Sequence, residues 1–310
     1  AHLNGRPHAM IEALAAYNPQ PDITQARWIM NEVLALGITH VEWMFWPAST
    51  SGPRPPRGLY GDPGFPTLAA FVNRASYLLG EGKPAAQIGV YIPSSSFWFG
   101  DTQANDDFKN VVHQLLQDQR DLDYVDEGAL SGGLVRQGGA FINKSGQAYR
   151  AIFVPPVDAI SKASLDNLHA VAQAGGQAIF LGHAPTLVMD KNFLTATGPA
   201  DISWAMLEPK VEITPAVLAA LPAPDVALSQ ADADIRYNHR QLKDADVYFF
   251  FNESDQPTDL TATVATAAGA QSAQAWDGDT GAVTAYPGAS FANGKATLPL
   301  KLAPGEGRLI

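Results

Sequence analysis

The hydrophobic period of this chain changes near residue 210, and that change limits the folds it can adopt. Before this point, short apolar runs alternate with segments whose apolar residues recur roughly every three to four positions, which predicts strands alternating with helices. After it, short alternating segments are separated by turn pairs such as Asp277-Gly278 and Asn293-Gly294. We therefore predict an α/β chain followed by a β-sandwich domain over residues 211–310, whose last strand we expect to be cut short.

The first 82 residues follow the order strand, helix, strand, long loop, helix. Pro7 to Ala13 and Thr39 to Phe45 are predicted strands, and Asp22 followed by Gln25 is typical of a helix start. The two strands should be parallel, but two strands cannot close a sheet. We predict that residues 1–82 are the C-terminal portion of a (β/α)₈ catalytic barrel, with about six earlier strands outside this sequence.

Strands and helices also alternate densely over residues 83–210. Apolar runs at 88–92, 122–125, 150–154 and 177–181 are separated by segments of helical period. This density predicts a flavodoxin-like, amidotransferase-like domain built on a parallel sheet.

The predicted flavodoxin-like domain contains two polar stretches. Ser94-Ser95-Ser96 follows the first strand, where such folds bind phosphate, but no glycine-rich turn accompanies it. The acidic stretch from Asp123 to Glu127 is interpreted first as a solvated turn and second as a cation site. We therefore assign this domain a structural or assembly role.

Composition excludes several kinds of chemistry. The 310 residues include no cysteine, which rules out disulfides, thiolate metal ligands and a thiol nucleophile. A formal charge of −11 repels nucleic-acid phosphates, and no apolar run reaches the roughly 20 residues that cross a bilayer. The histidines are scattered without a metal-ligand spacing. We expect neither a nucleic-acid nor a membrane partner.

Glu12 is the main candidate for a catalytic residue. It ends a predicted buried strand, after Ala9-Met10-Ile11, at the barrel edge where catalytic groups occur. An unpaired carboxylate in an apolar strand is costly, so it needs a partner or a function; an ordinary loop-facing glutamate is the alternative. Glu42 alternates with Val41 and Trp43 in the next strand, which favours an orientation into the barrel. There it would bind a sugar hydroxyl or a metal, or pair with an arginine.

Aromatic and arginine side chains follow at the same edge. Trp43 and Trp46 offer flat apolar faces on which sugar rings stack, although aromatic residues in strands more often belong to a core. The long loop after them is placed to cover a cleft, or else is simply solvated. The predicted site comprises Glu12 as the catalytic residue and, as substrate-binding residues, Glu42, Trp43, Trp46, Arg54 and Arg57. The sequence identifies no metal ligands.

Several short motifs, in order along nearly the whole chain, match one known family. They occupy residues 1–12, 35–40, 77–83, 122–130, 239–240 and 244–252. Ala1 to Glu12 resembles the segment that leads into the catalytic glutamate of the family 106 glycoside hydrolases, the α-L-rhamnosidases. Ala35 to His40 resembles that family's turn into the last barrel strand. Each motif alone is loose, but the ordered set is specific.

The resemblance implies a (β/α)₈ catalytic barrel, an amidotransferase-like domain and β-sandwich modules. It further implies calcium-dependent, inverting hydrolysis of α-L-rhamnosides, with Glu12 as the general base. The acid partner would come from an earlier barrel strand, so we expect the chain alone to be inactive. The sequence from Glu42 to Pro47 departs from the family's pattern, so the resemblance does not fix which sugar the protein recognises.

Two other functions remain open at this point. A retaining β-galactosidase-like hydrolase would use Glu12 as its nucleophile, and a non-catalytic carbohydrate-binding or scaffold protein would use it for neither role. The expected partners are a rhamnose-containing glycan or glycoside and the missing N-terminal part of the same polypeptide. We expect a secreted or periplasmic bacterial protein.

Overall fold

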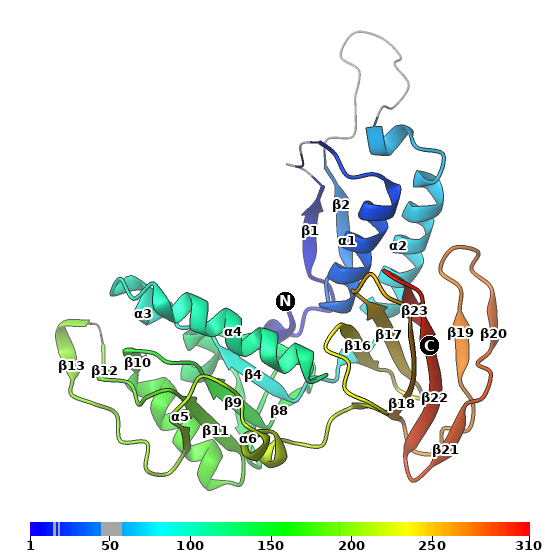
Figure 1. Ribbon diagram of the computed structural model, residues 1–310. Coiled ribbons are helices and arrows are strands. Elements are labelled where there is room, and N and C mark those ends of the chain that lie inside the picture. The colour runs from blue at the N-terminus through cyan, green and yellow to red at the C-terminus, as the bar shows by residue number, and fades with distance from the viewer. Residues whose placement is uncertain (15–16, 18, 45–57, 192) are drawn as a thin grey trace. The chain divides into compact units, whose positions relative to one another are not determined.

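The computed structural model describes residues 1–14, 17, 19–44, 58–191 and 193–310 (Figure 1). The chain has a mixed α/β fold and divides into two compact units. Unit 1 contains Ala1–Arg6 and Ala85–Pro224, and unit 2 contains Pro7–Pro84 and Asp225–Ile310. The chain therefore leaves unit 2 after Pro84, forms most of unit 1 and returns to unit 2 at Asp225.

A parallel five-stranded sheet forms the centre of unit 1. Its strands are β4 (Ile88–Tyr91), β5 (Leu122–Val125), β9 (Ala151–Val154), β11 (Gln177–Leu181) and β14 (Met206–Glu208). They lie in the order β14-β11-β9-β4-β5, so the sheet grows from β4 in two directions.

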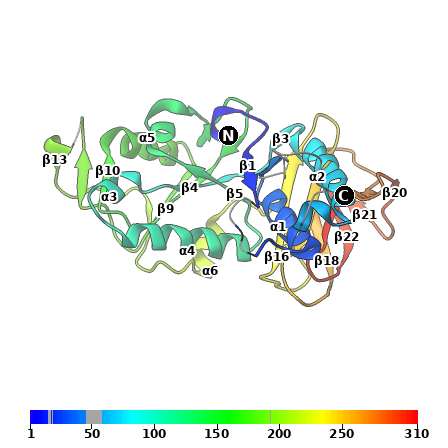
Figure 2. The same ribbon diagram turned by 90° about the horizontal axis from the view of Figure 1, so that it is seen from above.

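Helices cover both faces of this sheet, which explains why its central strands are apolar throughout. The helices are α3 (Ser94–Trp98), α4 (Gln103–Gln117), α5 (Lys162–Gln173) and α6 (Pro215–Ala220). On one face Val90 and Phe153 pack against α4 and α6. On the other face Ile152 packs against Leu168 and Val171 of α5. Figure 2 shows α5 on one side of the sheet and α4 and α6 on the other.

Short strands complete unit 1. An antiparallel sheet contains β6 (Val135–Gln137), β7 (Ala140–Ile142) and β8 (Ala148–Tyr149). A second small sheet contains β10 (Ala159–Ser161), β12 (Leu187–Met189) and β13 (Ala196–Thr197).

The N-terminal residues 1–6 belong to unit 1 because a buried carboxylate holds them. Asp123 Oδ1 lies 2.7 Å from His2 Nδ1, and Asp123 Oδ2 accepts hydrogen bonds from Gln147 Nε2 at 2.6 Å and Tyr149 Oη at 2.9 Å. Burial alone would raise the pKa of Asp123, but these hydrogen bonds and the charge of His2 lower it overall. The interpretation of the acidic stretch as a solvated turn is thus wrong for Asp123, whose partner lies far away in sequence.

Unit 2 begins with two β/α repeats. These are β1 (Met10–Ala13), α1 (Ile23–Ala35), β2 (His40–Trp43) and α2 (Phe65–Gly80), with β1 and β2 parallel. The predicted start of α1 is confirmed, since Asp22 accepts from the backbone N–H of Gln25 while the Gln25 side chain accepts from that of Asp22. Gly37 follows the helix with a left-handed φ of 88°.

Two antiparallel sheets form the rest of unit 2. The six-stranded sheet runs β20 (Val283–Ala285), β19 (Gln274–Trp276), β23 (Gly307–Leu309), β17 (Asp246–Asn252), β16 (Ile235–Gln241) and β3 (Lys83–Pro84). The four-stranded sheet runs β15 (Val226–Leu228), β18 (Thr258–Ala265), β22 (Lys295–Leu302) and β21 (Ser290–Ala292). Phe250 of β17 packs with Leu260 and Leu300 in the core between the two sheets.

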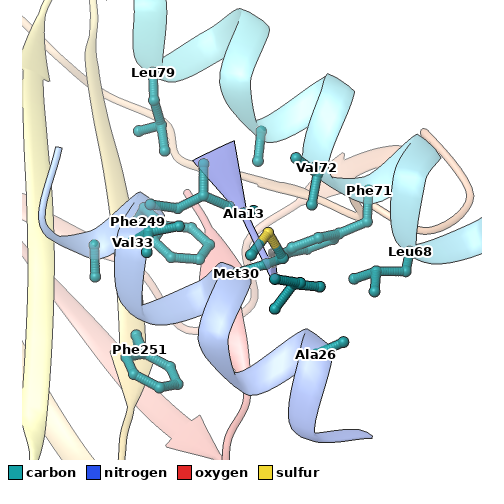
Figure 3. Packing of buried hydrophobic residues seen from close by; sticks show 14 of the residues in the cluster. Ala13, Ala26, Met30, Val33, Leu68, Phe71, Val72, Leu79, Phe249 and Phe251 are labelled. Atoms are coloured by element: carbon teal, nitrogen blue, oxygen red, sulfur yellow. The ribbon is translucent and has the colours of Figure 1, made fainter. Parts of the chain in front are cut away.

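The outer face of the six-stranded sheet packs against α1 and α2. Phe249 and Phe251 of β17 share one buried cluster with Met30 of α1 and Phe71 and Val72 of α2 (Figure 3). Polar contacts reinforce this packing, since Asn238 donates to the carbonyl of Leu34 at 2.9 Å and Trp28 donates to that of Glu253 at 3.0 Å.

The shared cluster explains why the compact units differ from the predicted domains. The predicted boundaries fall at 82/83 and 210/211 and separate the repeats from the β-rich region. In the structure the two β/α repeats and the β-rich region both belong to unit 2. The six-stranded sheet has apolar side chains on both faces, and α1 and α2 cover its outer face. Among the described residues, no helix is long and apolar enough to cross a membrane.

Unit 2 also buries an imidazole between two carboxylates. Nδ1 of His239 lies 3.1 Å from Asp225 Oδ2, and its Nε2 lies 2.8 Å from Asp246 Oδ1. Its ring stacks on Tyr248 with centroids 4.1 Å apart. Burial alone would lower the pKa of His239, but the hydrogen bonds and charges of the two aspartates outweigh it and raise the pKa.

We expect the free energy of unfolding to decrease as the pH rises above neutrality. The folded pKa of His239 is above its unfolded value of about 6.5, so its stabilising contribution is complete below that pH and is lost as the pH rises through the folded pKa. Urea titrations from about pH 6 to about pH 9 measure this slope. His239→Gln should reduce it, and equal slopes in both proteins would contradict the assignment.

Candidate functional site

Glu12 and Glu42 lie side by side near the carboxyl ends of β1 and β2. The parallel register places Glu12 opposite Glu42 and Met10 opposite His40. All four side chains are exposed, and they share one face because alternate residues of a strand point the same way. Since adjacent strands lie about 4.8 Å apart, the two glutamates are direct neighbours.

The opposite face of this strand pair packs against the helices. Ala13 is buried there, with Ile11, Val41 and Trp43 packed against the same cluster as α1 and α2. In a (β/α)₈ barrel the helices lie outside the strands. Glu12 and Glu42 therefore occupy the face that would line the interior of such a barrel.

The backbone is strained directly after β1. Leu14 is buried and has a left-handed φ of 64°, a conformation that costs a residue with a Cβ about 1–2 kcal/mol. Such strain gathers at functional sites, where the surrounding structure holds it in place. It lies two residues after Glu12.

Trp43 lies on the helix-facing side of β2, away from the two glutamates. Its ring meets Phe65 edge-to-face with centroids 5.1 Å apart, and Tyr60 contacts Phe65 at the same distance. The Tyr60 hydroxyl donates to the carbonyl of Met44, and burial raises its pKa. This placement is that of a core aromatic residue and favours a supporting role for Trp43 on β2; the substrate-binding role remains an untested prediction.

The other predicted substrate-binding residues are Trp46, Arg54 and Arg57. All three lie outside the described residues, and their roles stay predictions.

The described residues contain no gathering of three or more acidic or histidine side chains that would hold a metal ion. The neighbouring carboxylates of Glu12 and Glu42 supply at most four oxygens, whereas calcium takes about six to eight.

A second polar group lies at the carboxyl edge of the parallel sheet in unit 1. Glu127, two residues after β5, accepts hydrogen bonds from Tyr91 Oη at 3.2 Å, from the backbone N–H of Ser161 at 2.6 Å, and from the hydroxyl of Ser95. Burial, then the charge and hydrogen bond of Glu127, raise the pKa of Tyr91, which keeps its hydroxyl protonated as a donor. Glu127 belongs to the acidic stretch that was predicted to be a solvated turn, and its position just after a parallel strand is the sequence signal that pointed to a site.

A family model described as alpha-L-rhamnosidase matches residues 65–287, well over half of the chain. The chain belongs to glycoside hydrolase family 106. The resemblance found in the sequence is thereby confirmed. The match begins at α2, so it includes neither Glu12 nor Glu42. No curated protein sequence matches the chain significantly.

Solved glycosidase structures share the fold. A rhamnosidase from Novosphingobium sp. PP1Y superposes with a TM-score of 0.70 at 20% identity, covering 100% of this chain and 31% of its own. An alpha-L-fucosidase from Paenibacillus thiaminolyticus gives 0.58 at 9% identity, covering 99% and 61%. A GH42 beta-galactosidase from G. stearothermophilus gives 0.55 at 10% identity, covering 94% and 51%. The chain thus spans about a third of the rhamnosidase, and these likenesses concern the fold alone.

Proposed function

We propose that this chain is a fragment of an inverting glycoside hydrolase that cleaves terminal α-L-rhamnosides. The observation that carries the proposal is the placement of Glu12, beside Glu42, at the carboxyl end of a parallel strand and on its helix-free face. Membership in the α-L-rhamnosidase family supplies the substrate class.

In this proposal Glu12 is the general base. Its carboxylate takes a proton from a water molecule while the water oxygen attacks the anomeric carbon, and the bond to the leaving oxygen breaks. A general acid protonates that leaving oxygen, and its carboxyl group lies about 6.5–9.5 Å from that of the general base, which leaves room for the water. We assign the acid to an earlier barrel strand, so the chain alone is expected to be inactive.

Glu42 is proposed to bind substrate. Its carboxylate accepts hydrogen bonds only, so it suits a sugar hydroxyl next to the reacting carbon. Trp46, Arg54 and Arg57 are proposed to complete the sugar contacts, and Trp43 to support the strand on which Glu42 lies.

Two features support the proposed architecture. The order β5-β4-β9-β11-β14 in unit 1 is the second-first-third-fourth-fifth order of flavodoxin-like sheets. The two antiparallel sheets of unit 2, with their common core, suit a β-sandwich, and β1 and β2 with their helices suit the end of a (β/α)₈ barrel. The remaining strands would come from a preceding segment of the polypeptide. We further propose secretion or a periplasmic location.

Calcium has no complete site among the described residues, since two carboxylates fall short of its usual oxygen set. The calcium dependence that the family resemblance implies therefore stays a prediction.

The second candidate function is that of a retaining, β-galactosidase-like hydrolase. It requires two carboxyl groups about 5–5.5 Å apart, with Glu12 as the nucleophile. The direct neighbourhood of Glu12 and Glu42 on adjacent strands favours this option.

The configuration of the first product tests these options. The polypeptide containing this chain and the preceding barrel strands is mixed with 4-nitrophenyl α-L-rhamnopyranoside, and proton NMR follows the anomeric signals. We expect β-L-rhamnose to appear first. Initial α-L-rhamnose would overturn inversion in favour of the retaining mechanism, and saturable binding without release of nitrophenol would indicate a non-catalytic binding protein.

A further inference from the structure

A pocket of about 610 Å³ opens at the carboxyl edge of the parallel sheet in unit 1. Its lining comes from segments that follow parallel strands: Ser95 and Trp98 after β4, Glu127 after β5, and Ser161 at the start of α5. Figure 1 places α3, β10 and β12 together at this end of the unit. The volume lies within the usual range of small-molecule pockets, about 300–1,000 Å³.

The topology favours a ligand at this edge. The chain leaves β4 through α4 on one face of the sheet, and it leaves the adjacent β9 through α5 on the other face. Connections that diverge in this way leave a crevice between neighbouring strand ends, where open α/β sheets bind their ligands.

The polar part of the pocket is held in a fixed position. Oε1 of Glu127 accepts from Tyr91 and from the backbone of Ser161, and Oε2 accepts from Ser95. A carboxylate has about four acceptor positions, so these three hydrogen bonds leave room on Oε2 for one ligand hydroxyl. The fully buried Ser96 accepts from the backbone N–H groups of Asp158 and Ala159 at 3.0 and 3.1 Å, which fastens α3 to the segment leading into β10.

The apolar part of the pocket is an exposed aromatic surface. Trp98 is 84% exposed, and Phe99 beside it is 46% exposed. Exposed aromatic rings next to a fixed hydrogen-bond acceptor suit a ligand with one apolar face and polar edges. A pyranose ring has that form, because its C–H groups form the face and its hydroxyls the edge.

The charges of the pocket argue against a phosphate ligand. Its charged lining residues are Glu127, Asp190 and Lys191, which sum to −1. The Glu127 carboxylate accepts a hydrogen bond from Ser95 at the edge where flavodoxin-like sheets bind phosphate, and both Ser95 and Ser96 are buried and hydrogen-bonded within the protein. A negative pocket repels anions and accepts neutral hydroxylated compounds.

We propose that this pocket is a binding site for a neutral pyranose ring. The ring stacks on Trp98, and one of its hydroxyls donates to Oε2 of Glu127. The inference concerns binding in unit 1 and does not depend on turnover at Glu12.

The test is a titration of the 310-residue chain, labelled with ¹⁵N, with methyl α-L-rhamnopyranoside and methyl β-D-galactopyranoside. The indole N–H signal of Trp98 is assigned as the one missing from Trp98→Ala. We expect a saturable shift of this signal with a dissociation constant of about a millimolar for at least one sugar. Methyl β-D-glucuronide and adenosine monophosphate should cause no saturable shift of this signal, since both are anions.

Three variants locate the site. Trp98→Ala should weaken binding about tenfold, measured by ligand-observed saturation transfer. Glu127→Gln should weaken it comparably, because an amide N–H₂ would replace the free acceptor. Trp276→Ala, at an exposed tryptophan of unit 2, is the matched control and should leave the affinity unchanged.

The proposal would be overturned if neither sugar caused a saturable shift of the Trp98 signal, or if Trp98→Ala left the affinity unchanged. Loss of binding in Trp276→Ala, or tighter binding of adenosine monophosphate than of the sugars, would overturn it as well. Because Trp98 is largely exposed, its substitution should leave the fold intact, which the dispersion of the remaining signals verifies.

Discussion

Replacing Glu12 by glutamine should lower kcat for an aryl α-L-rhamnoside by about 10²- to 10⁴-fold in the polypeptide that contains the whole barrel. The amide keeps the size of the side chain and the strand register, but it cannot take a proton from water. KM should change little, since the general base acts mainly in the transition state. The decrease of kcat/KM toward acidic pH, which reports protonation of the base, should disappear as well. Steady-state rates of nitrophenol release measure all three quantities.

Met10→Leu is the matched control for this substitution. Met10 lies two residues earlier on the same exposed face of β1, so the change perturbs the same strand without touching a carboxylate. Its kcat should stay within about twofold of the parent, because methionine and leucine are close in volume and both are apolar. A similarly small effect of Glu12→Gln would remove Glu12 from the mechanism under either the inverting or the retaining proposal.

Replacing Phe249 by alanine should destabilise unit 2 by about 3–5 kcal/mol. Its ring is fully buried where β17 meets α1 and α2, so truncation leaves a cavity between the sheet and both helices. Urea unfolding measures the loss of stability. Hydrogen exchange by mass spectrometry should show faster exchange in the peptides covering α1 and α2, because their packing surface is the one that is lost.

Phe250→Ala provides the matched comparison. Phe250 is the next residue on β17, is equally buried and faces the core between the two antiparallel sheets. Its substitution should speed exchange mainly in β18 and β22. The same exchange pattern for both variants would contradict the division of unit 2 into two packing layers.

Local patterns predicted the individual elements well, because helix caps and periodicity act over a few residues. Asp22 and Gln25 fixed the start of α1, and the alternation around Glu42 predicted the side of β2 on which it lies. Aromatic residues were harder to place, because the same alternation puts Trp43 on the opposite side, against Phe65.

Long-range partners could not be derived from the sequence pattern. Asp123 is paired with His2, 121 positions away, so a stretch that looks solvated is partly a buried anchor. The pocket around Glu127 is assembled from four separate strand ends, and no single segment carries its signature. The predicted boundary at 210/211 differs from that of the compact units because α1 and α2 pack against β17, a contact that periodicity within each element does not specify.

The return of the chain to unit 2 at Asp225 has a consequence during synthesis on the ribosome. Helices α1 and α2 are complete by Gly80, yet their buried partners Phe249 and Phe251 are added some 170 residues later. At about 5–20 residues per second, the apolar sides of both helices remain without the strand that covers them for roughly 8–34 s. All residues of unit 1 are synthesised by Pro224, before the chain returns to unit 2 at Asp225, so unit 1 can fold during this interval. The nascent chain would then carry one finished unit and a pair of exposed amphipathic helices, which is the kind of surface that chaperones bind.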